Sequence, residues 1–294
     1  MSDFIGTKLT MNLGERSYDI ILKNGALENL YQFARLDRKV AVVTDSGVPA
    51  QYAQRVADQC RDALIITVPQ GEASKSFKIL ETVLKQMLDF HMGRGDLVVA
   101  VGGGVVGDLA GFAASIYMRG IDFINCPTTT LSMIDSSIGG KTAVDLGDTK
   151  NIVGAFWQPK LVIVDPDTLA TLPRRHYING LAEAVKASLL ADPELFAIFE
   201  KGDIDGQINE IIYRSLRFKK NIVEQDETEH GMRKALNFGH TIGREGHQGT
   251  PHHRPVPRRV RGAGYAAHDR IQGAAKAGAG GLPPLGAAPA HHLQ

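Results

Sequence analysis

Short runs of β-branched residues alternate with helical patterns through the first 170 residues, and this alternation restricts the fold more than any other feature of the chain. Strand-like runs lie at residues 40–44, 64–68, 97–101, 121–125 and 161–164, with helical patterns at 49–61 and 77–91. Such alternation predicts an α/β domain with a mainly parallel sheet. A hairpin of residues 9–13 and 18–22 is expected before it.

A glycine-rich segment follows the strand-like run at residues 97–101. Residues 102–108 read GGGVVGD, which satisfies the G-x-G-x-x-G pattern between a predicted strand and a predicted helix. Glycines there let backbone N–H groups and the helix N-terminus approach a pyrophosphate. From this motif alone, the interpretation as a glycine-rich turn that binds no ligand stays open. The context favours a Rossmann-like nucleotide-binding domain, which we place at residues 1–171.

Helical periodicity replaces the alternation beyond residue 172. One predicted helix face carries Leu181, Ala184, Val185, Ser188 and Leu189. We therefore expect an all-helical second domain, which we place at residues 172–243.

Residues 139–142 (GGKT) look like the end of a phosphate loop of an NTPase. The first glycine of that motif would fall at Asp135, whose carboxylate would repel phosphates, so we reject an NTPase. Lys141 remains a plausible point charge for a phosphate or carboxylate of a substrate.

Two further groups of polar residues have helical spacing. Glu183 and Lys186 lie three apart, which predicts an ion pair on one helix face, and for this pair alone a surface pair is the simpler interpretation. A second stripe consists of Glu229, Arg233, Asn237 and His240. An acid, a guanidinium, an amide and an imidazole on one helix favour a site for a polar anion and a metal.

Charge and cysteine content exclude several classes of protein. There are 33 Lys and Arg against 32 Asp and Glu, so the net charge of +1 predicts neither a nucleic-acid nor a membrane-surface partner. Cys60 and Cys126 form no disulfide framework, and the N-terminus lacks a basic start followed by an apolar run, so we expect a cytoplasmic protein. The apolar residues 97–118 include Asp108 and five glycines, which predicts a buried strand, turn and helix and no membrane span.

The last 51 residues differ in composition from the rest. Residues 244–294 hold 6 of the 10 His, 6 of the 13 Pro and none of the 11 Phe, and their net charge is +5. Because they are poor in large apolar side chains, we expect this tail to be disordered. A nucleic-acid-binding tail is a weaker alternative, since the tail lacks a series of aromatic residues on which bases could stack.

A series of ordered motifs resembles one enzyme family. They are GEASKS (71–76), GGGVVGD (102–108), PTT (127–129), DSSIGGK (135–141), KN (150–151), GLAEAVK (180–186) and LNFGHTIG (236–243). In this order they resemble 3-dehydroquinate synthase, and the resemblance runs from about residue 5 to residue 243. It implies a lyase of the shikimate pathway that converts 3-deoxy-D-arabino-heptulosonate 7-phosphate to 3-dehydroquinate and phosphate. It also implies NAD, zinc or cobalt, and a homodimer.

The resemblance assigns roles to individual residues. The implied NAD contacts are Asp45, Glu72, Lys75, Gly103, Gly104, Val105, Asp108, Thr128, Thr129, Lys150 and Thr171. The implied substrate contacts are Arg119, Asp135, Lys141, Asn151, Lys186, Lys219, Arg233 and Asn237. Glu183 and His240 match two metal ligands, and Glu229 matches a residue with an acid–base role. Lys141, Lys186, Arg233 and Asn237 are expected to act with Glu229 in catalysis.

The chain departs from the family after residue 243, which implies that the helical domain at residues 172–243 is incomplete. The family has a second His one helical rung after the position of His240, where this chain has Arg244, and a later HGE segment whose His completes the metal site. A catalytic zinc normally has three protein ligands, so Glu183 and His240 alone should hold it weakly. We interpret the tail as the product of a frameshift. One choice of codons for residues 257–269, when read from the second base, encodes HGECVALGMLPM, which contains the missing HGE.

Two alternatives stay open at this point. Metal-dependent alcohol or glycerol dehydrogenases share the expected architecture, but they would release NADH in proportion to substrate. An inactive remnant that binds NAD without a metal would release no phosphate.

Overall fold

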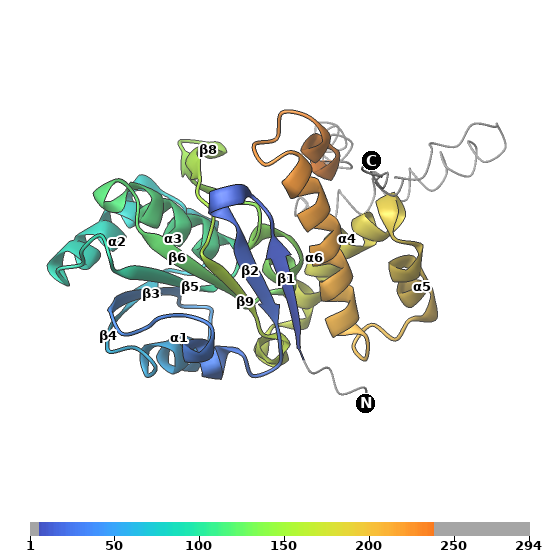
Figure 1. Cartoon of the computed structure of the whole chain (residues 1–294), viewed down its shortest axis with the longest axis horizontal. Helices are drawn as coiled ribbons and strands as arrows, with labels where there is room; N and C mark the ends of the chain where they lie inside the picture. Colours follow the sequence, from blue (N-terminus) through green and yellow to red (C-terminus); the bar gives the residue numbers. More distant parts are fainter. Residues whose placement is uncertain (1–5, 238–294) are drawn as a thin grey trace, which may run out of the picture. The chain divides into compact units, whose positions relative to one another are not determined.

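The computed structural model describes residues 6–237. Contacts group the chain up to Arg233 into one compact unit and the residues from Lys234 on into another. The first unit contains a seven-stranded sheet in the order β1-β2-β9-β6-β5-β3-β4 (Figure 1). The strands are β1 (Thr7–Met11), β2 (Tyr18–Leu22), β3 (Lys39–Asp45), β4 (Asp62–Val68), β5 (Leu97–Gly102), β6 (Asp122–Pro127) and β9 (Leu161–Val164). All neighbours from β2 to β4 are parallel, and only β1 pairs antiparallel, with β2. The expected mainly parallel α/β sheet is confirmed.

Helices cover both faces of this sheet. They are α1 (Ala50–Ala57), α2 (Phe77–Asp89), α3 (Gly104–Ile116), α4 (Arg174–Ala191), α5 (Pro193–Lys201) and α6 (Ile208–Gln225). Alternate residues of β3 point to opposite faces: Val43 packs with α2 and α3, and Val42 packs with α1. On the side of β2 and β9, the apolar residues of the sheet pack against α4, α5 and α6. The helices after residue 172 therefore pack directly on the sheet.

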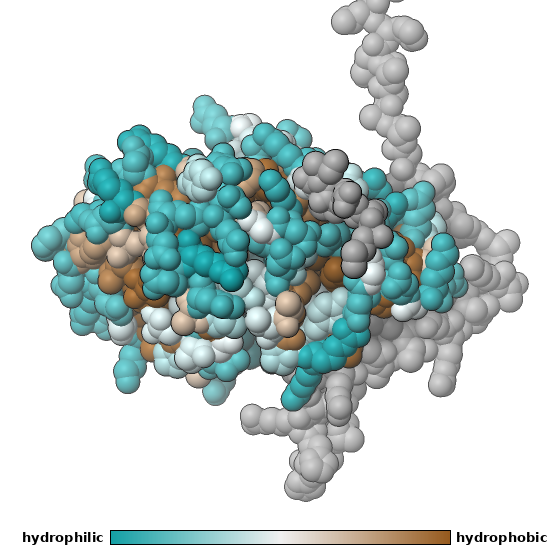
Figure 2. All heavy atoms as spheres, turned by 90° about the horizontal axis from the view of Figure 1, so that it is seen from below, coloured by the Kyte–Doolittle hydropathy of each residue, from teal (hydrophilic) through white to brown (hydrophobic). Residues whose placement is uncertain are grey.

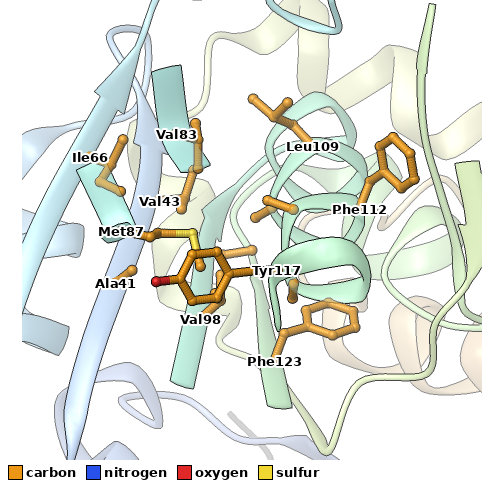
Figure 3. Close-up of a cluster of buried hydrophobic side chains, with 14 of the residues drawn as sticks. Ala41, Val43, Ile66, Val83, Met87, Val98, Leu109, Phe112, Tyr117 and Phe123 are labelled. Carbon is orange, nitrogen blue, oxygen red and sulfur yellow. The ribbon is translucent and has the colours of Figure 1, made fainter. Parts of the chain in front are cut away.

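The core between β3, β5, β6, α2 and α3 is close-packed. Figure 3 shows Met87 and Tyr117 facing Val43 and Val98, with Phe123 beside them. Each of these five side chains is at most 9% exposed. Such packing fixes α3 on the sheet, and with it the glycine-rich turn where α3 begins.

Several local expectations can be compared with the structure. The helix expected at residues 49–61 ends at Ala57, and the one expected at 77–91 ends at Asp89. The apolar residues 97–118 form β5 and α3, as expected, and no helix within residues 6–237 is long and apolar enough to cross a membrane. Hydrophilic residues dominate the face seen in Figure 2, with hydrophobic ones visible between them.

The hairpin of β7 (Lys141–Leu146) and β8 (Thr149–Phe156) was not expected.

Gly180 lets α4 cross closely over the backbone at Thr130 and Leu131. A Cβ atom on Gly180 would lie 2.5 Å from the backbone nitrogen of Leu131 and 2.5 Å from Cβ of Thr130. We therefore expect Gly180→Ala to lower the free energy of unfolding by about 1–3 kcal/mol, the usual cost of overpacking. Urea denaturation measures the change. As a control, Gly95→Ala places its Cβ where no atom lies within 4 Å, and it should stay within about 0.5 kcal/mol of the parent. Equal stability of the two variants would contradict this account of the crossing.

Candidate active site

The sheet has a topological switch point between β3 and β5. The chain leaves β3 for β4 on one side, and then continues from β5 to β6 on the other. In open parallel sheets, ligands bind beyond the carboxyl ends of the strands at such a point. Asp45 ends β3 and Gly102 ends β5, and the carbonyl of Gly102 accepts a hydrogen bond from the Thr128 N–H at 2.9 Å. This edge is therefore the candidate site.

The glycine-rich turn lies tightly against its neighbours. A Cβ on Gly102 would lie 2.7 Å from Cβ of Val106, and one on Gly104 would lie 3.0 Å from Oγ of Ser136. Gly103, which precedes α3, would bring a Cβ to 3.1 Å from Cγ2 of Thr129. The first turn of α3 also directs backbone N–H groups outward. We call residues 102–104 and this first turn the glycine cradle; its glycines have no side chains at a helix N-terminus, which is where pyrophosphates bind.

Lys75 lies buried beside this cradle. Its side chain is 3% exposed, and its Nζ lies 2.6 Å from Oδ2 of Asp108 on α3. It also donates a hydrogen bond to Oδ1 of Asn151 at the start of β8. Burial raises the pKa of Asp108 to about 6, while Lys75 and Lys219 act to lower it. The cradle therefore borders a cluster of charged side chains that extends toward Lys219.

Lys219 on α6 and Asp135 pair within that charged cluster. Nζ of Lys219 lies 2.8 Å from Oδ1 of Asp135 and also donates to the Asp135 carbonyl. Burial lowers the pKa of Lys219, and Arg233 and Lys141 lower it further, although Asp135 opposes them. Burial acts to raise the pKa of Asp135, but Lys219 outweighs it and holds that pKa below the ordinary value.

Arg233 is fully enclosed, with 1% of its surface exposed. Its Nη2 donates to the carbonyl of Gly139 at 2.9 Å, and its Nη1 donates to the carbonyl of Glu227. Gly139 has φ of +93°, and a Cβ there would lie 2.4 Å from Nη2 of Arg233. Burial lowers the pKa of the guanidinium, and the carboxylate of Glu229 opposes this. A buried cation held by backbone carbonyls suits the binding of an anion.

The helical stripe expected from Glu229 to His240 is wrong at its first residue. Glu229 has φ of +64°, in the left-handed region, and its carboxylate pairs with Nζ of Lys141. The chain turns here because the Asp226 carboxylate accepts the backbone N–H groups of His230, Gly231 and Arg233 at 2.7–2.9 Å. Among the described residues 229–237, the helical part is the short turn Met232–Asn237. The Asn237 side chain and His240 lie outside the described residues.

Glu183 and Lys186 form the expected pair on α4, but it is not a surface pair. Each side chain is 6% exposed, and Nζ of Lys186 contacts Oε2 of Glu183. Within residues 6–237, no group of three His, Cys, Asp or Glu side chains is arranged to hold a metal ion. The described part of the chain therefore contains one of the two expected metal ligands.

Each of four lysines in the site contacts a carboxylate. The pairs are Lys75 with Asp108, Lys141 with Glu229, Lys186 with Glu183, and Lys219 with Asp135. Three of the four lysine side chains are less than 10% exposed. An anion that enters this site would find its cations already ordered, which lowers the cost of binding.

Some expected contacts lie at the edge of this cluster or away from it. Glu72 and Lys150 form an exposed pair at 3.4 Å, and the Thr171 hydroxyl lies 2.9 Å from that of Tyr52. Val105 and Thr129 lie at the start of α3 and after β6, beside the cradle. Arg119, by contrast, follows α3 and precedes β6, so it lies at the amino end of the strands, opposite the cradle.

Sequence reasoning missed three residues that hold the site together. The Tyr18 hydroxyl accepts the N–H of Gly139 at 3.1 Å. The Glu227 carboxylate accepts two hydrogen bonds from Arg16, at 2.7 and 3.2 Å, beside the turn of Asp226. Asp is common in turns because its side chain accepts hydrogen bonds from nearby backbone N–H groups, and this preference could have indicated Asp226. Tyr18 and Glu227 act through contacts distant in sequence, for which there is no local signal.

Known proteins share both the sequence and the fold. Models of the 3-dehydroquinate synthase N-terminal and C-terminal domains match residues 65–179 and 180–251. The 3-dehydroquinate synthase of Clostridium beijerinckii is 41% identical over 246 residues, which cover 80% of this chain and 70% of that protein. That of Streptococcus thermophilus is 44% identical over 250 residues, with the same coverage.

Two solved structures have the same fold. A 2-deoxy-scyllo-inosose synthase complexed with carbaglucose-6-phosphate, NAD⁺ and Co²⁺ is 25% identical with a TM-score of 0.78, over 90% of this chain and 78% of the other. The 2-epi-5-epi-valiolone synthase of Streptomyces hygroscopicus with NAD⁺ and Zn²⁺ is 28% identical with a TM-score of 0.75, over 88% and 77%. With its two matched domains and relatives above 40% identity, the chain belongs to the 3-dehydroquinate synthase family.

Proposed function

We propose that the chain converts 3-deoxy-D-arabino-heptulosonate 7-phosphate to 3-dehydroquinate and phosphate, with NAD and a divalent metal. The reaction comprises oxidation of an alcohol, phosphate elimination, reduction, ring opening and an intramolecular aldol. The observation that carries the proposal is a glycine cradle next to four ordered lysines and Arg233, at the switch point of the sheet. A dinucleotide and a doubly anionic sugar acid need those two features side by side.

The glycine cradle fits NAD, since it lies at the carboxyl end of β5 and directly before α3, where a helix N-terminus can bind a pyrophosphate. NAD supplies a reversible hydride acceptor when bound. The residues that would hold it at the cradle are Asp45, Lys75, Gly103, Gly104, Val105, Asp108, Thr128 and Thr129. Glu72, Lys150 and Thr171 would hold its more exposed parts. Backbone N–H groups of α3 would stabilise the pyrophosphate charge.

The cations of the site would bind the carboxylate and the phosphate of the sugar. Lys141, Lys219 and Arg233 surround one region, and Lys186 and Asp135 lie next to it. A bound anionic group would partly replace the carboxylate as the contact of each lysine. Glu229, beside Lys141, would hold or accept a proton at its carboxylate. Asn151 and Asn237 would complete the contacts to the sugar, and the ordered cations would align it for ring closure.

Glu183 and His240 would bind the zinc or cobalt ion. Glu183 offers a buried carboxylate on α4, and His240 lies outside the described residues. Because residues 6–237 include no three-ligand group, we derive no step of the reaction through the metal. The family resemblance further supports a homodimer in the cytoplasm.

Incubation with the heptulosonate phosphate, NAD⁺ and Zn²⁺ is expected to release phosphate without net formation of NADH. A phosphate assay and NADH absorbance, recorded on the same sample, measure both. Lys219→Met serves as the control, since it removes a site cation and should release less phosphate. NADH formed in proportion to substrate would instead identify a dehydrogenase, and NAD⁺ binding without phosphate release would identify an inactive remnant.

A further inference from the structure

The hairpin of β7 and β8 contains a β-bulge next to Lys75. The two strands pair regularly from Lys141 opposite Phe156 to Val144 opposite Val153, and the register then shifts between Val144 and Leu146. Asp145 lies in this shift, and its backbone N–H donates to the carbonyl of Lys75 at 2.8 Å. A bulge frees a backbone group from the strand ladder, and bulges are enriched beside active sites.

The side chain of Asp145 continues the connection. Its Oδ1 accepts the backbone N–H of Asn151 at 2.7 Å. Asn151 has φ of +56°, in the left-handed region that non-glycine residues rarely adopt, although Asn tolerates it better than most. The bond from Asp145 therefore holds Asn151 in a conformation that costs free energy by itself.

A third hydrogen bond closes a ring. Oδ1 of Asn151 accepts from Nζ of Lys75, whose carbonyl already accepts from Asp145. The ring joins the loop before α2, Asp145 of β7 and the bulged part of β8, where residues 150–152 face Asp145. The same Nζ reaches Asp108 of the cradle helix at 2.6 Å. The ammonium of Lys75 thus has its position set from two sides, by α3 and by the hairpin.

We propose that Asp145 is a positioning residue for cofactor binding, which places the Lys75 ammonium at the glycine cradle by holding Asn151 in its left-handed conformation. This inference rests on the proposed function, because it gives Lys75 a cofactor to contact. Asp145 is half-buried and Asn151 is exposed, so neither contributes much to the core. Substitutions there should change the position of Lys75 more than they change the stability of the chain.

Four variants of the full chain test this proposal by calorimetric titration with NAD⁺. Asp145→Ala should weaken NAD⁺ binding about tenfold, the effect of losing roughly one or two hydrogen bonds. Asp145→Asn keeps an oxygen acceptor for the Asn151 N–H and should restore affinity to within about threefold of the parent. Asn151→Gly accepts the left-handed conformation but lacks the amide, so it should bind as weakly as Asp145→Ala. The double variant Asp145→Ala/Asn151→Gly should be no weaker than either, because the residues act as one unit.

The outcomes against the proposal are equally specific. It is overturned if Asp145→Ala binds NAD⁺ like the parent, if Asp145→Asn fails to restore binding, or if the two losses add in the double variant. Thermal unfolding of each variant separates positioning from general destabilisation.

Amide hydrogen exchange without NAD⁺ tests the ring independently of the cofactor. Exchange at residues 145–151 should speed up in Asp145→Ala but not in Asp145→Asn. Unchanged exchange in Asp145→Ala would overturn the ring. If exchange in the variants changes as expected but the parent chain does not bind NAD⁺, the ring is supported and the proposed function is contradicted.

Discussion

Replacing Arg233 by methionine is expected to weaken binding of the sugar phosphate at least about 100-fold and to destabilise the fold by about 2–4 kcal/mol. The guanidinium is 1% exposed and bonds the carbonyls of Gly139 and Glu227, so its loss leaves two buried acceptors without their donor. It also removes a cation enclosed where its charge is little screened by water. Calorimetry with the heptulosonate phosphate and urea denaturation measure the two effects.

Two variants make the interpretation specific. Arg233→Lys keeps the charge, but an ammonium lacks the planar fork that spans both carbonyls, so we expect it to recover only part of the affinity. Arg35→Met removes a guanidinium of the same type that is 77% exposed and pairs with Asp37. That surface variant should leave both stability and sugar binding close to those of the parent, because water screens an exposed ion pair. Parent-like sugar binding by Arg233→Met would contradict its assignment to the substrate.

The sequence predicted the sheet well, because its strands are buried on both faces and read as continuous apolar runs. β9 (Leu161–Val164) has the expected bounds, and β5 (Leu97–Gly102) differs by one residue. The hairpin of β7 and β8 gave no such signal, since it lies mostly exposed and begins within a glycine–lysine motif. Missing this hairpin also hid Asp145, whose role depends on a bulge and not on spacing.

Within the site, local spacing predicted which residues meet but not how deeply they are buried. Glu183 and Lys186 pair as their spacing on one helix indicates, yet their burial depends on packing across the unit. The stripe beginning at Glu229 was wrong because the Asp226 side chain competes with helix formation for three backbone N–H groups. Glu227 holds that turn through Arg16, 211 residues away, and no periodic pattern records such a contact.

A chain whose residues 244–294 are replaced by the frame-corrected segment that contains HGE is expected to bind Zn²⁺ at least about tenfold more tightly and to release phosphate faster. Glu183 and His240 supply two of the three protein ligands that a catalytic zinc normally has, and the His of the HGE segment would supply the third. Loss of a residue that only supports a metal ligand typically costs about 10–100-fold in affinity or activity, and loss of the ligand itself should cost no less. Competition with a chelator measures Zn²⁺ affinity, and the phosphate assay measures turnover.

The matched control carries the same replacement with alanine in place of the His of HGE. If the third ligand is the cause, this control returns to the Zn²⁺ affinity of the present chain while keeping the stability of the replaced chain. If the new segment acts only by covering apolar helix surface, the control keeps both gains, and the metal explanation is wrong. Resequencing of the gene provides an independent test, since the frameshift requires that a one-base correction opens a route to HGEC. NAD⁺ affinity should be the same in all three chains, because the glycine cradle and Lys75 lie entirely within residues 6–237.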